Sequence, residues 1–273
     1  MPEVSGVELA GDLEDLSKRT RLPNSDPLNV VKQFSQTGDL EVAGLIASAF
    51  AFGTAKAISS AVGRILAEME KSPRDFLLEN GSRLSGRFAG FRYRFIDGKA
   101  LGEFLKGISR GLREAGSLEA LFLAGYRPGA DMRQAIGDFV GGIRAGTRDR
   151  MARYLLPDPS RGSACKRMNL FLRWMVRREE PDLGLWKGIR PEDLVIPLDV
   201  HVGRVARRLG LTERKTNDWA TAMEITESLK RFSAWDPTKY DLCLSKLGAL
   251  GACRKVPACG ECSVAACPSR GKS

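Results

Sequence analysis

Apolar residues recur at helical spacing along almost the whole chain, and the alternation expected for β-strands is hard to find. The pattern predicts helices over residues 27–36, 39–52, 54–70, 99–114, 131–146, 163–178, 200–209, 217–231 and 237–250. Glycine and proline cluster between these segments and limit the helices to about 10–16 residues, which suits a globular bundle and not a coiled coil. We therefore expect an all-α fold with two helical lobes.

The predicted helices divide the chain into three parts. Residues 1–24 would form an N-terminal extension, residues 25–250 a helical domain of two lobes, and residues 251–273 a Cys-rich loop and tail. The first residues are acidic and lack the basic-then-apolar order of a signal peptide. The longest apolar run, residues 45–52, is far too short to span a bilayer. We expect a cytoplasmic protein that binds no membrane, with a monomer as the default.

The balance of charge narrows the class of partner. The 273 residues include 43 Lys and Arg against 33 Asp and Glu, which gives a formal net charge of +10. Such a surface attracts polyanions, and nucleic acid is the commonest polyanion in a cell. A basic surface that serves solubility alone is the other interpretation. Charge by itself leaves both open, and the nucleic-acid interpretation predicts a nucleoid-associated protein.

One predicted helix carries a candidate nucleophile in its first turn. Ser163 can cap the helix over residues 163–178. The core-facing stripe of this helix is formed by Met168, Phe171, Leu172 and Met175. Lys166 lies on the polar face, where the positive end of the helix dipole, with Arg161 and Arg167 nearby, disfavours a protonated amine. A nucleophilic lysine needs the neutral amine, although an ordinary solvated lysine is the simpler interpretation of Lys166 alone.

A second predicted helix begins at a candidate carboxylate. Residues 197–211 indicate a turn, an N-capping Asp199, a short helix and a glycine stop. The only histidine, His201, lies with Arg204 and Arg208 opposite the apolar stripe. Since the sequence supplies no relay partner for His201, a structural or phosphate-contacting role is favoured over a general base. Taken alone, Asp199 is most simply a helix cap.

Together the two helices resemble a known constellation. The pattern Asp-x-His-x-x-Arg over residues 199–204, followed by Arg-Arg-Leu-Gly-Leu over 207–211, resembles the catalytic-aspartate helix of the helix-hairpin-helix DNA glycosylases, the endonuclease III superfamily. Lys166 matches the Schiff-base lysine of the bifunctional members of that superfamily. The interval from Lys166 to Asp199 is similar to that in archaeal 8-oxoguanine glycosylases. The resemblance implies a two-lobed HhH-GPD glycosylase fold.

Over residues 25–267 the chain resembles an uncharacterised bacterial family within that superfamily, DUF2400. Residues 45–53 and 173–177 contribute to this resemblance. The hairpin departs from the superfamily pattern, because residues 157–162 contain a single glycine where the usual hairpin is glycine-rich. A phosphate would then bind at the N-terminus of the 163–178 helix with the help of Arg161.

The resemblance implies a base-excision repair glycosylase that acts on double-stranded DNA containing a damaged base. Lys166 would attack the anomeric carbon and form an imine that leads to strand cleavage, an AP-lyase activity, with an oxidised purine such as 8-oxoguanine as one candidate base. Asp199 would stabilise the positive sugar and assist deprotonation of Lys166. The alternatives are a catalytically inactive helix-hairpin-helix DNA-binding protein and a redox or metal-sensing DNA-binding regulator.

Further residues are assigned to DNA. Candidates for contacts with the DNA backbone are Arg161, Gly162, Ser163, Arg173, Arg177, His201, Arg204, Arg207, Arg208, Arg254 and Lys255. Candidates for a base pocket, each with the hydrophobic core as the alternative, are Phe50, Phe52, Trp174 and Trp235.

Four of the six cysteines lie close together near the C-terminus, at Cys253, Cys259, Cys262 and Cys267. In a reducing compartment such a group is more often a metal site than two disulfides. The spacing resembles the four-cysteine loop that holds a [4Fe–4S] cluster in endonuclease III, with two gaps one residue shorter. Zinc and no metal remain alternatives, since one close Cys-x-x-Cys pair suits a cluster or a tetrahedral zinc. A cluster would be structural, with Arg254 and Lys255 presented to DNA.

Overall fold

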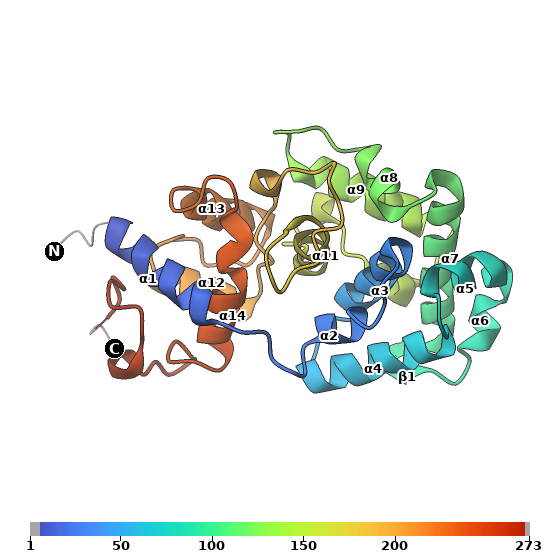
Figure 1. Cartoon of the computed structure of the whole chain (residues 1–273), viewed down its shortest axis with the longest axis horizontal. Coiled ribbons are helices and arrows are strands. Elements are labelled where there is room, and N and C mark those ends of the chain that lie inside the picture. The colour runs from blue at the N-terminus through green and yellow to red at the C-terminus, as the bar shows by residue number, and fades with distance from the viewer. Residues whose placement is uncertain (1–5, 271–273) are drawn as a thin grey trace. The chain divides into compact units, whose positions relative to one another are not determined.

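The computed structural model describes residues 6–270 and is mostly helical (Figure 1). The α-helices are α1 (Gly6–Arg19), α2 (Pro27–Val31), α3 (Thr37–Ala49), α4 (Ala55–Glu68), α5 (Pro73–Asn80), α6 (Leu84–Arg87), α7 (Gly98–Ala115), α8 (Leu118–Leu123), α9 (Met132–Arg144), α10 (Arg150–Leu155), α11 (Lys166–Val176), α12 (Val200–Arg208), α13 (Trp219–Lys230) and α14 (Asp241–Ala249). The 3₁₀ turns are η1 (Gly81–Arg83), η2 (Pro159–Arg161), η3 (Pro191–Asp193), η4 (Pro237–Tyr240) and η5 (Cys259–Glu261). Helices therefore dominate, as the sequence pattern predicts.

Two short antiparallel strands, β1 (Arg92–Tyr93) and β2 (Ile96–Asp97), interrupt the helices and form a hairpin with Tyr93 opposite Ile96. The sequence pattern misses this hairpin, because its two turn residues, Arg94 and Phe95, lack the glycine or asparagine that usually marks such a turn. Arg94 nevertheless adopts a left-handed backbone with φ of 53°.

Every predicted helix overlaps a helix of the structure, and most of the observed helices are shorter than predicted, although α7 is longer. The helix predicted over 163–178 begins only at Lys166, and the one predicted over 237–250 opens with η4 before α14. Helices α1, α5, α6, α8 and α10 are not predicted. In α1 the fully buried side chains are only Leu9 and Leu13, so its apolar stripe is too sparse to stand out.

The chain divides into two compact units, which are described separately. Within the described residues, unit 1 comprises 6–22, 162–173 and 190–270, and unit 2 comprises Pro23–Arg161 and Trp174–Ile189. Unit 1 therefore includes both α1, which was expected to be an extension, and the Cys-rich segment.

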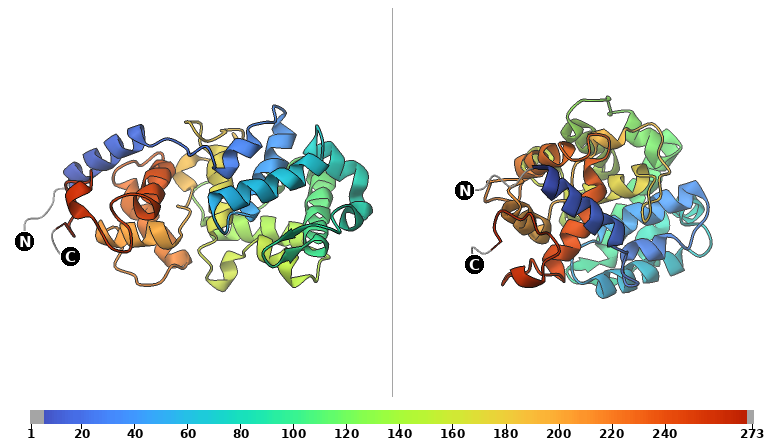
Figure 2. Two further views of the ribbon diagram at one scale, coloured as in Figure 1. Left: turned by 90° about the horizontal axis from the view of Figure 1, so that it is seen from below. Right: turned by 60° about the vertical axis from the view of Figure 1, so that its left-hand side comes forward.

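Unit 2 is built around α7, the longest of its helices. This helix packs against α5, α6, α8, α9 and α10, which run from cyan to green in Figure 2. The contact with α9 is close enough that a Cβ on Gly107 would lie 2.1 Å from the carbonyl oxygen of Ile143. Nearly all of α3 is buried, including Glu41, whose carboxylate accepts hydrogen bonds from Trp186 Nε1 at 2.7 Å and from the first turn of α8. Burial raises the pKa of Glu41 despite these donors.

In unit 1, α12 and α14 form the main helix pair. Gly248 allows this approach, since a Cβ there would lie 2.8 Å from the carbonyl oxygen of His201. The blue helix α1 and the red C-terminal segment lie side by side in Figures 1 and 2, joined by a hydrogen bond of 2.8 Å from Ala266 N to Asp12 Oδ2.

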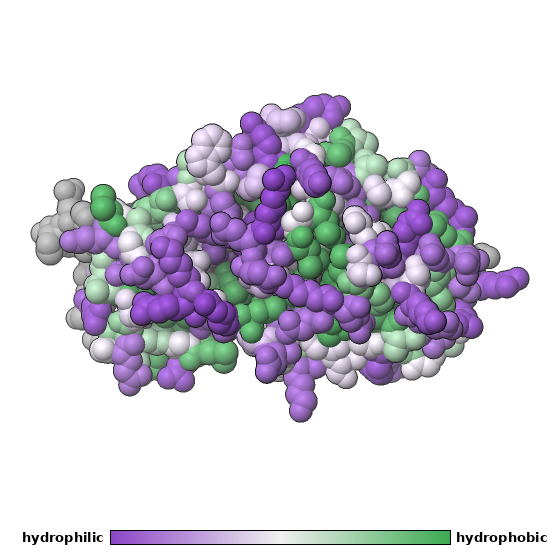
Figure 3. Space-filling view, viewed as in Figure 1, coloured by the Kyte–Doolittle hydropathy of each residue, from purple (hydrophilic) through white to green (hydrophobic). Residues whose placement is uncertain are grey.

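Hydrophilic side chains cover much of the face shown in Figure 3, with apolar patches between them. Among the described helices, none combines the length and apolarity needed to cross a membrane.

Candidate functional site

Asp199 is the N-cap of α12, as the sequence predicts. Its Oδ1 accepts hydrogen bonds from the backbone N–H groups of His201 at 2.8 Å and Val202 at 3.0 Å. Both donors belong to the first helical turn, which has no carbonyl partners of its own. One carboxylate oxygen therefore holds the helix, and the other, Oδ2, remains available.

Lys166 is the first residue of α11 and follows a strained position. The carbonyl of Cys165 accepts the first helical hydrogen bonds, from Met168 N at 2.9 Å and Asn169 N at 3.0 Å. Cys165 itself has a left-handed φ of 47°, which residues other than glycine and asparagine rarely adopt. The predicted Ser163 cap is displaced, because Ser163 Oγ accepts from Cys165 N in the turn before the helix.

The two candidate catalytic side chains meet. Lys166 Nζ lies 2.9 Å from Asp199 Oδ2, with side-chain exposures of 35% and 17%. Burial disfavours the charged form of Asp199, but the charge and hydrogen bond of Lys166 and the two backbone donors outweigh it, so the pKa of Asp199 is lowered. The carboxylate is thus ionised at neutral pH and half-exposed Lys166 remains reachable from solvent.

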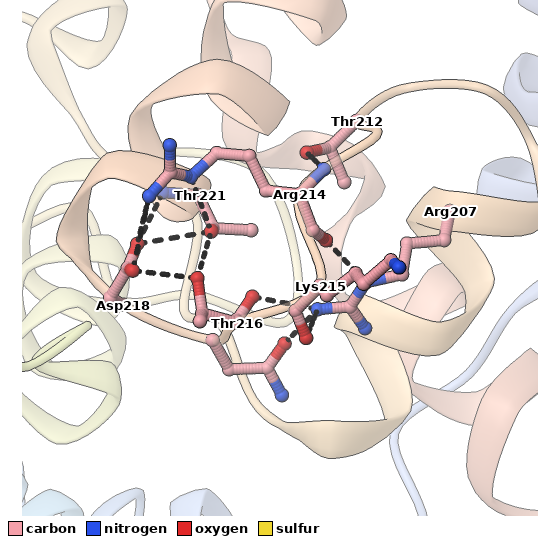
Figure 4. A network of polar contacts seen from close by, with 8 residues as sticks. Arg207, Thr212, Arg214, Lys215, Thr216, Asp218 and Thr221 are labelled. Carbon is pink, nitrogen blue, oxygen red and sulfur yellow. Dashed lines mark hydrogen bonds and ion pairs between the residues drawn. The ribbon is translucent and has the colours of Figure 1, made fainter.

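The loop over residues 212–218 lies beside this pair and is held by two arginines (Figure 4). Arg207, on α12, donates to the carbonyl oxygens of Arg214 at 2.6 Å and Thr216 at 2.7 Å. Arg214 in turn lies 3.2 Å from Asp218 Oδ2 and donates to Thr221 Oγ1 at 3.0 Å.

Asp218 is the N-cap of α13 and accepts several hydrogen bonds in this network. The Thr216 hydroxyl donates to it at 2.6 Å, and the backbone N–H of Thr221 donates at 2.9 Å. These donors, with the Arg214 guanidinium, hold the pKa of Asp218 well below its usual value. Hydrogen bonds from Arg207 and to Asp218 therefore fix the conformation of the loop.

The same loop brings the first turns of three helices together. Asp218 forms a β-bridge with Ser163, and Trp219 N donates to the carbonyl of Gly162 at 3.1 Å, which joins the start of α13 to the start of α11. Asn217 Nδ2 lies 3.5 Å from the carbonyl oxygen of Asp199 at the start of α12. The starts of α11, α12 and α13 therefore adjoin one another. Sequence reasoning misses this loop, although the Thr-Asn-Asp run before Trp219 is an N-cap signal.

His201 and Arg204 face the partner helix α14. Arg204 Nη2 donates to the carbonyl oxygen of Gly248 at 3.0 Å and lies 2.9 Å from His201 Nδ1. Both side chains are half-buried. His201 therefore serves the contact between the helices and makes no relay with Asp199 in this geometry.

Two residues assigned to the DNA surface are buried, and that assignment is wrong. The side chain of Arg173 is 4% exposed and pairs with buried Asp241, within unit 1. The side chain of Arg177 is 6% exposed and lies 2.5 Å from Asp182 Oδ2, within unit 2. These two guanidinium groups are thus satisfied by internal carboxylates and cannot bind DNA phosphates.

The remaining DNA candidates fall into two groups. Arg161, Gly162, Arg254 and Lys255 are exposed. Arg207 and Arg208 are instead occupied with backbone carbonyls of their own unit. Among the aromatic candidates, Phe50 and Trp174 are core residues, whereas Trp235 is 78% exposed and Phe52 is half-buried in a ring cluster of unit 2.

The four C-terminal cysteines line one cavity of about 450 Å³, together with Arg208, Lys255 and apolar side chains. Arg208 Nη1 lies 3.3 Å from Cys253 Sγ, and the backbone carbonyl oxygen of Arg208 lies 3.5 Å from Cys267 Sγ. The pKa of Cys267 is raised by burial and also by its three cysteine neighbours. No three His, Cys, Asp or Glu side chains of residues 6–270 lie close enough together to hold a single metal ion. The metal at this loop remains a prediction.

A family model described as "Protein of unknown function (DUF2400)" matches residues 26–250. No curated protein and no solved structure matches the chain. The DUF2400 name agrees with the resemblance drawn from the sequence. The wider assignment to the helix-hairpin-helix DNA glycosylase superfamily, including the likeness to archaeal 8-oxoguanine glycosylases, is wrong, because the family that matches is DUF2400, of unknown function, and not a glycosylase family.

Proposed function

Because the chain belongs to the DUF2400 family, whose function is unknown, we propose its function from its own residues: excision of a damaged base from double-stranded DNA. The observation that carries the proposal is the Lys166–Asp199 contact of 2.9 Å at two adjoining helix starts. An amine and a carboxylate in contact, one of them reachable from solvent, are the two groups that a Schiff-base mechanism needs. A two-lobed glycosylase architecture is part of the same proposal.

In the proposed reaction Lys166 Nζ attacks C1′ of the deoxyribose. The new N–C1′ bond forms as the glycosidic C1′–N bond breaks, and the base leaves with the bonding electron pair and takes up a proton. Ring opening then gives an imine between Nζ and C1′. Loss of a C2′ proton from this imine expels the 3′-phosphate, which is the AP-lyase step.

Asp199 has two tasks in this scheme. Positive charge develops on the sugar as the base departs, and the ionised carboxylate stabilises it from a site with little water. The proton on Lys166 must also leave before attack, and Asp199 Oδ2 is the acceptor within reach. The lowered pKa of Asp199 keeps its carboxylate ionised before substrate binds, which both tasks require.

The surroundings of the pair suit a phosphate backbone. Exposed Arg254 and Lys255 add charge in the same unit. With a net charge of +10, DNA affinity should fall steeply with salt. The target base must be rotated out of the duplex, which costs least for damaged or mismatched bases.

A [4Fe–4S] cluster fits the Cys-rich loop better than one zinc ion. A cavity of about 450 Å³ with four cysteines on its wall suits a multi-atom group. Cys253, Cys259, Cys262 and Cys267 would hold it, and Arg208 would offset part of the thiolate charge. The cluster would supply folding energy to a segment that has little core of its own.

Borohydride trapping tests the proposal. Wild type, Lys166→Ala, Asp199→Asn and Lys215→Ala are incubated with duplexes that carry 8-oxoguanine, thymine glycol, uracil or an abasic site. We expect a covalent adduct with at least one duplex that disappears in Lys166→Ala and persists in Lys215→Ala, an exposed lysine of the neighbouring loop. An adduct that survives Lys166→Ala would contradict the assignment of the nucleophile.

A catalytically inactive DNA-binding protein is the second candidate. It is favoured by the contact itself, because an amine engaged by a carboxylate is not free to attack a sugar carbon. Salt-sensitive binding of all four duplexes with neither base release nor adduct would replace the glycosylase proposal with this one.

A further inference from the structure

Unit 2 carries a cluster of six aromatic rings that runs from the core to the surface. Its inner members are the fully buried Phe50 and the nearly buried Tyr93. Its outer members, Phe95 and Tyr154, are 48% and 41% exposed, which is unusual for large apolar side chains. The rings come from the end of α3, the β1–β2 hairpin and α10, so three separate elements supply one patch.

The outer rings are held in fixed orientations. Phe95 stacks on Phe52 with ring centroids 5.5 Å apart and planes 16° from parallel. Tyr154 meets both edge-on, at 5.0 Å from Phe95 and 5.5 Å from Phe52. Tyr93 supports the patch from below, since its hydroxyl donates to the carbonyl of Phe52 at 2.6 Å. Such a preorganised patch presents flat apolar faces to solvent without ordering mobile side chains first.

Arginines border the ring patch. Five exposed arginines lie in the two adjoining segments: Arg92, Arg94, Arg148, Arg150 and Arg153. Within residues 6–270 none of the five forms an ion pair. The two acidic residues of these segments, Asp97 and Asp149, use their carboxylates to cap α7 and α10. The border is therefore strongly positive.

Arg94 sits at the hairpin turn in a left-handed conformation, although glycine or asparagine would adopt it with less strain. A Cβ on Gly53 would lie 3.2 Å from Arg94 Nη1 and 2.6 Å from the Tyr93 hydroxyl. The guanidinium is thus folded over Gly53, next to Phe52. The turn therefore places the positive charge of Arg94 beside the rings, at a position where glycine or asparagine would fit the backbone with less strain.

Flat apolar rings close to exposed guanidinium groups that have no carboxylate partner match one ligand chemistry, a nucleic acid whose bases are unstacked. Bases in a duplex hide their faces, whereas unpaired bases expose them for stacking on aromatic side chains. We infer that Phe52, Phe95 and Tyr154 form a platform for one or two unpaired nucleotides, with Arg94 and Arg153 on the flanking phosphates. This inference does not rest on the proposed glycosylase activity, which uses other residues in unit 1.

A fluorescent base analogue tests the inference directly. The full chain is titrated with an oligothymidine of about twelve nucleotides that carries one central 2-aminopurine, whose fluorescence falls when it stacks on an aromatic ring. Anisotropy of an end label reports binding in the same samples. We expect wild type to bind and to quench the 2-aminopurine.

Leucine substitutions separate stacking from charge. In Phe95→Leu and Tyr154→Leu, which keep an apolar side chain, we expect the dissociation constant to rise about tenfold and the quenching to disappear. Val7→Ala, which changes an exposed apolar residue of unit 1, should leave both unchanged. Arg94→Gln and Arg153→Gln should weaken binding and reduce its salt dependence, whereas exposed Arg83→Gln should not.

Two outcomes would overturn the platform. One is quenching and affinity that are the same in wild type, Phe95→Leu and Tyr154→Leu. The other is a concentration-dependent dimer in sedimentation that Phe95→Leu dissolves while oligonucleotide binding stays intact, which would assign the patch to a second copy of the chain. Circular dichroism melts of each variant confirm folding, and neither outcome depends on borohydride trapping.

Discussion

The guanidinium of Arg208 lies 3.3 Å from the sulfur of Cys253 and also donates to the carbonyl oxygens of Arg254 at 2.7 Å and Lys255 at 3.3 Å. Arg208 is the last residue of α12, and Asp199 caps the first turn of the same helix. One short helix therefore connects the candidate catalytic carboxylate with the Cys-rich loop.

Adjacent arginines on α12 fix different loops, which predicts a paired pattern of proteolysis. Arg208→Ala should release the carbonyls of Arg254 and Lys255 and accelerate tryptic cleavage after these residues. Arg207→Ala should instead accelerate cleavage after Arg214 and Lys215, whose carbonyls it holds. Mass spectrometry of timed digests distinguishes the two. Equal acceleration at both loops in both variants would mean that α12 unfolds as a whole.

The two oxygens of Asp199 allow capping to be separated from chemistry. Asp199→Asn keeps a good cap and should change stability by a few tenths of a kcal/mol, whereas Asp199→Ala should cost about 0.5–2 kcal/mol. Both remove the carboxylate and should lower single-turnover base excision by about 10²–10⁴-fold. Urea unfolding and excision rates are measured on the same samples. An active Asp199→Asn enzyme would limit Asp199 to a structural role.

The loop network predicts an acid-sensitive contribution to stability. The folded protein lowers the pKa of Asp218 below the ordinary 3.8, so its carboxylate stabilises the fold fully above that pH. The contribution is lost as pH falls from 3.8 toward the folded pKa. The stability difference between wild type and Asp218→Asn should be constant from pH 5 to 8 and shrink near pH 3, as read from urea midpoints. A stability difference between the two proteins that grows as the pH falls would contradict a lowered pKa for Asp218.

Two helical glycines of unit 2 should respond in opposite directions to alanine. A Cβ on Gly107 meets the Ile143 carbonyl oxygen at 2.1 Å, and we expect Gly107→Ala to cost about 1–3 kcal/mol. A Cβ on Gly137 meets nothing within 4 Å, and Gly137→Ala should stabilise by about 0.5–1 kcal/mol. Thermal melts compare the pair. A neutral Gly107→Ala would mean that α7 and α9 can move apart freely.

The buried pair of Arg173 and Asp241 predicts a non-additive double mutant. Arg173→Met leaves a buried carboxylate without its charge partner and should cost about 3–5 kcal/mol. The double variant Arg173→Met/Asp241→Leu should recover most of that loss, because both charges are then absent. Denaturant unfolding of the two single variants and the double variant measures the coupling. Additive effects would show that the two side chains stabilise unit 1 independently.

The sequence predicts the positions of most helices and both residues of the candidate catalytic pair, because capping residues and apolar stripes are local signals. Lys166 and Asp199 stand at helix starts that such signals mark, although Cys165 shifts the first of them. The burial of Arg173 is not local information. Its partner Asp241 is 68 residues away, and a polar helix face is indistinguishable from a solvated one until that partner is placed. The aromatic patch is missed for the same reason, since Phe52, Phe95 and Tyr154 come from three elements.

The two carboxylate oxygens of Asp199 have different roles, since Oδ1 caps α12 and Oδ2 contacts Lys166. A lineage that abandoned the chemistry would still retain an aspartate or asparagine here, because the first turn of α12 depends on it. Lys166 donates to no backbone group in the described structure, and selection for folding alone would let it drift to other residues. If the proposed chemistry holds, substitution of the lysine, and not of the aspartate, is what would mark the DUF2400 members that lack it.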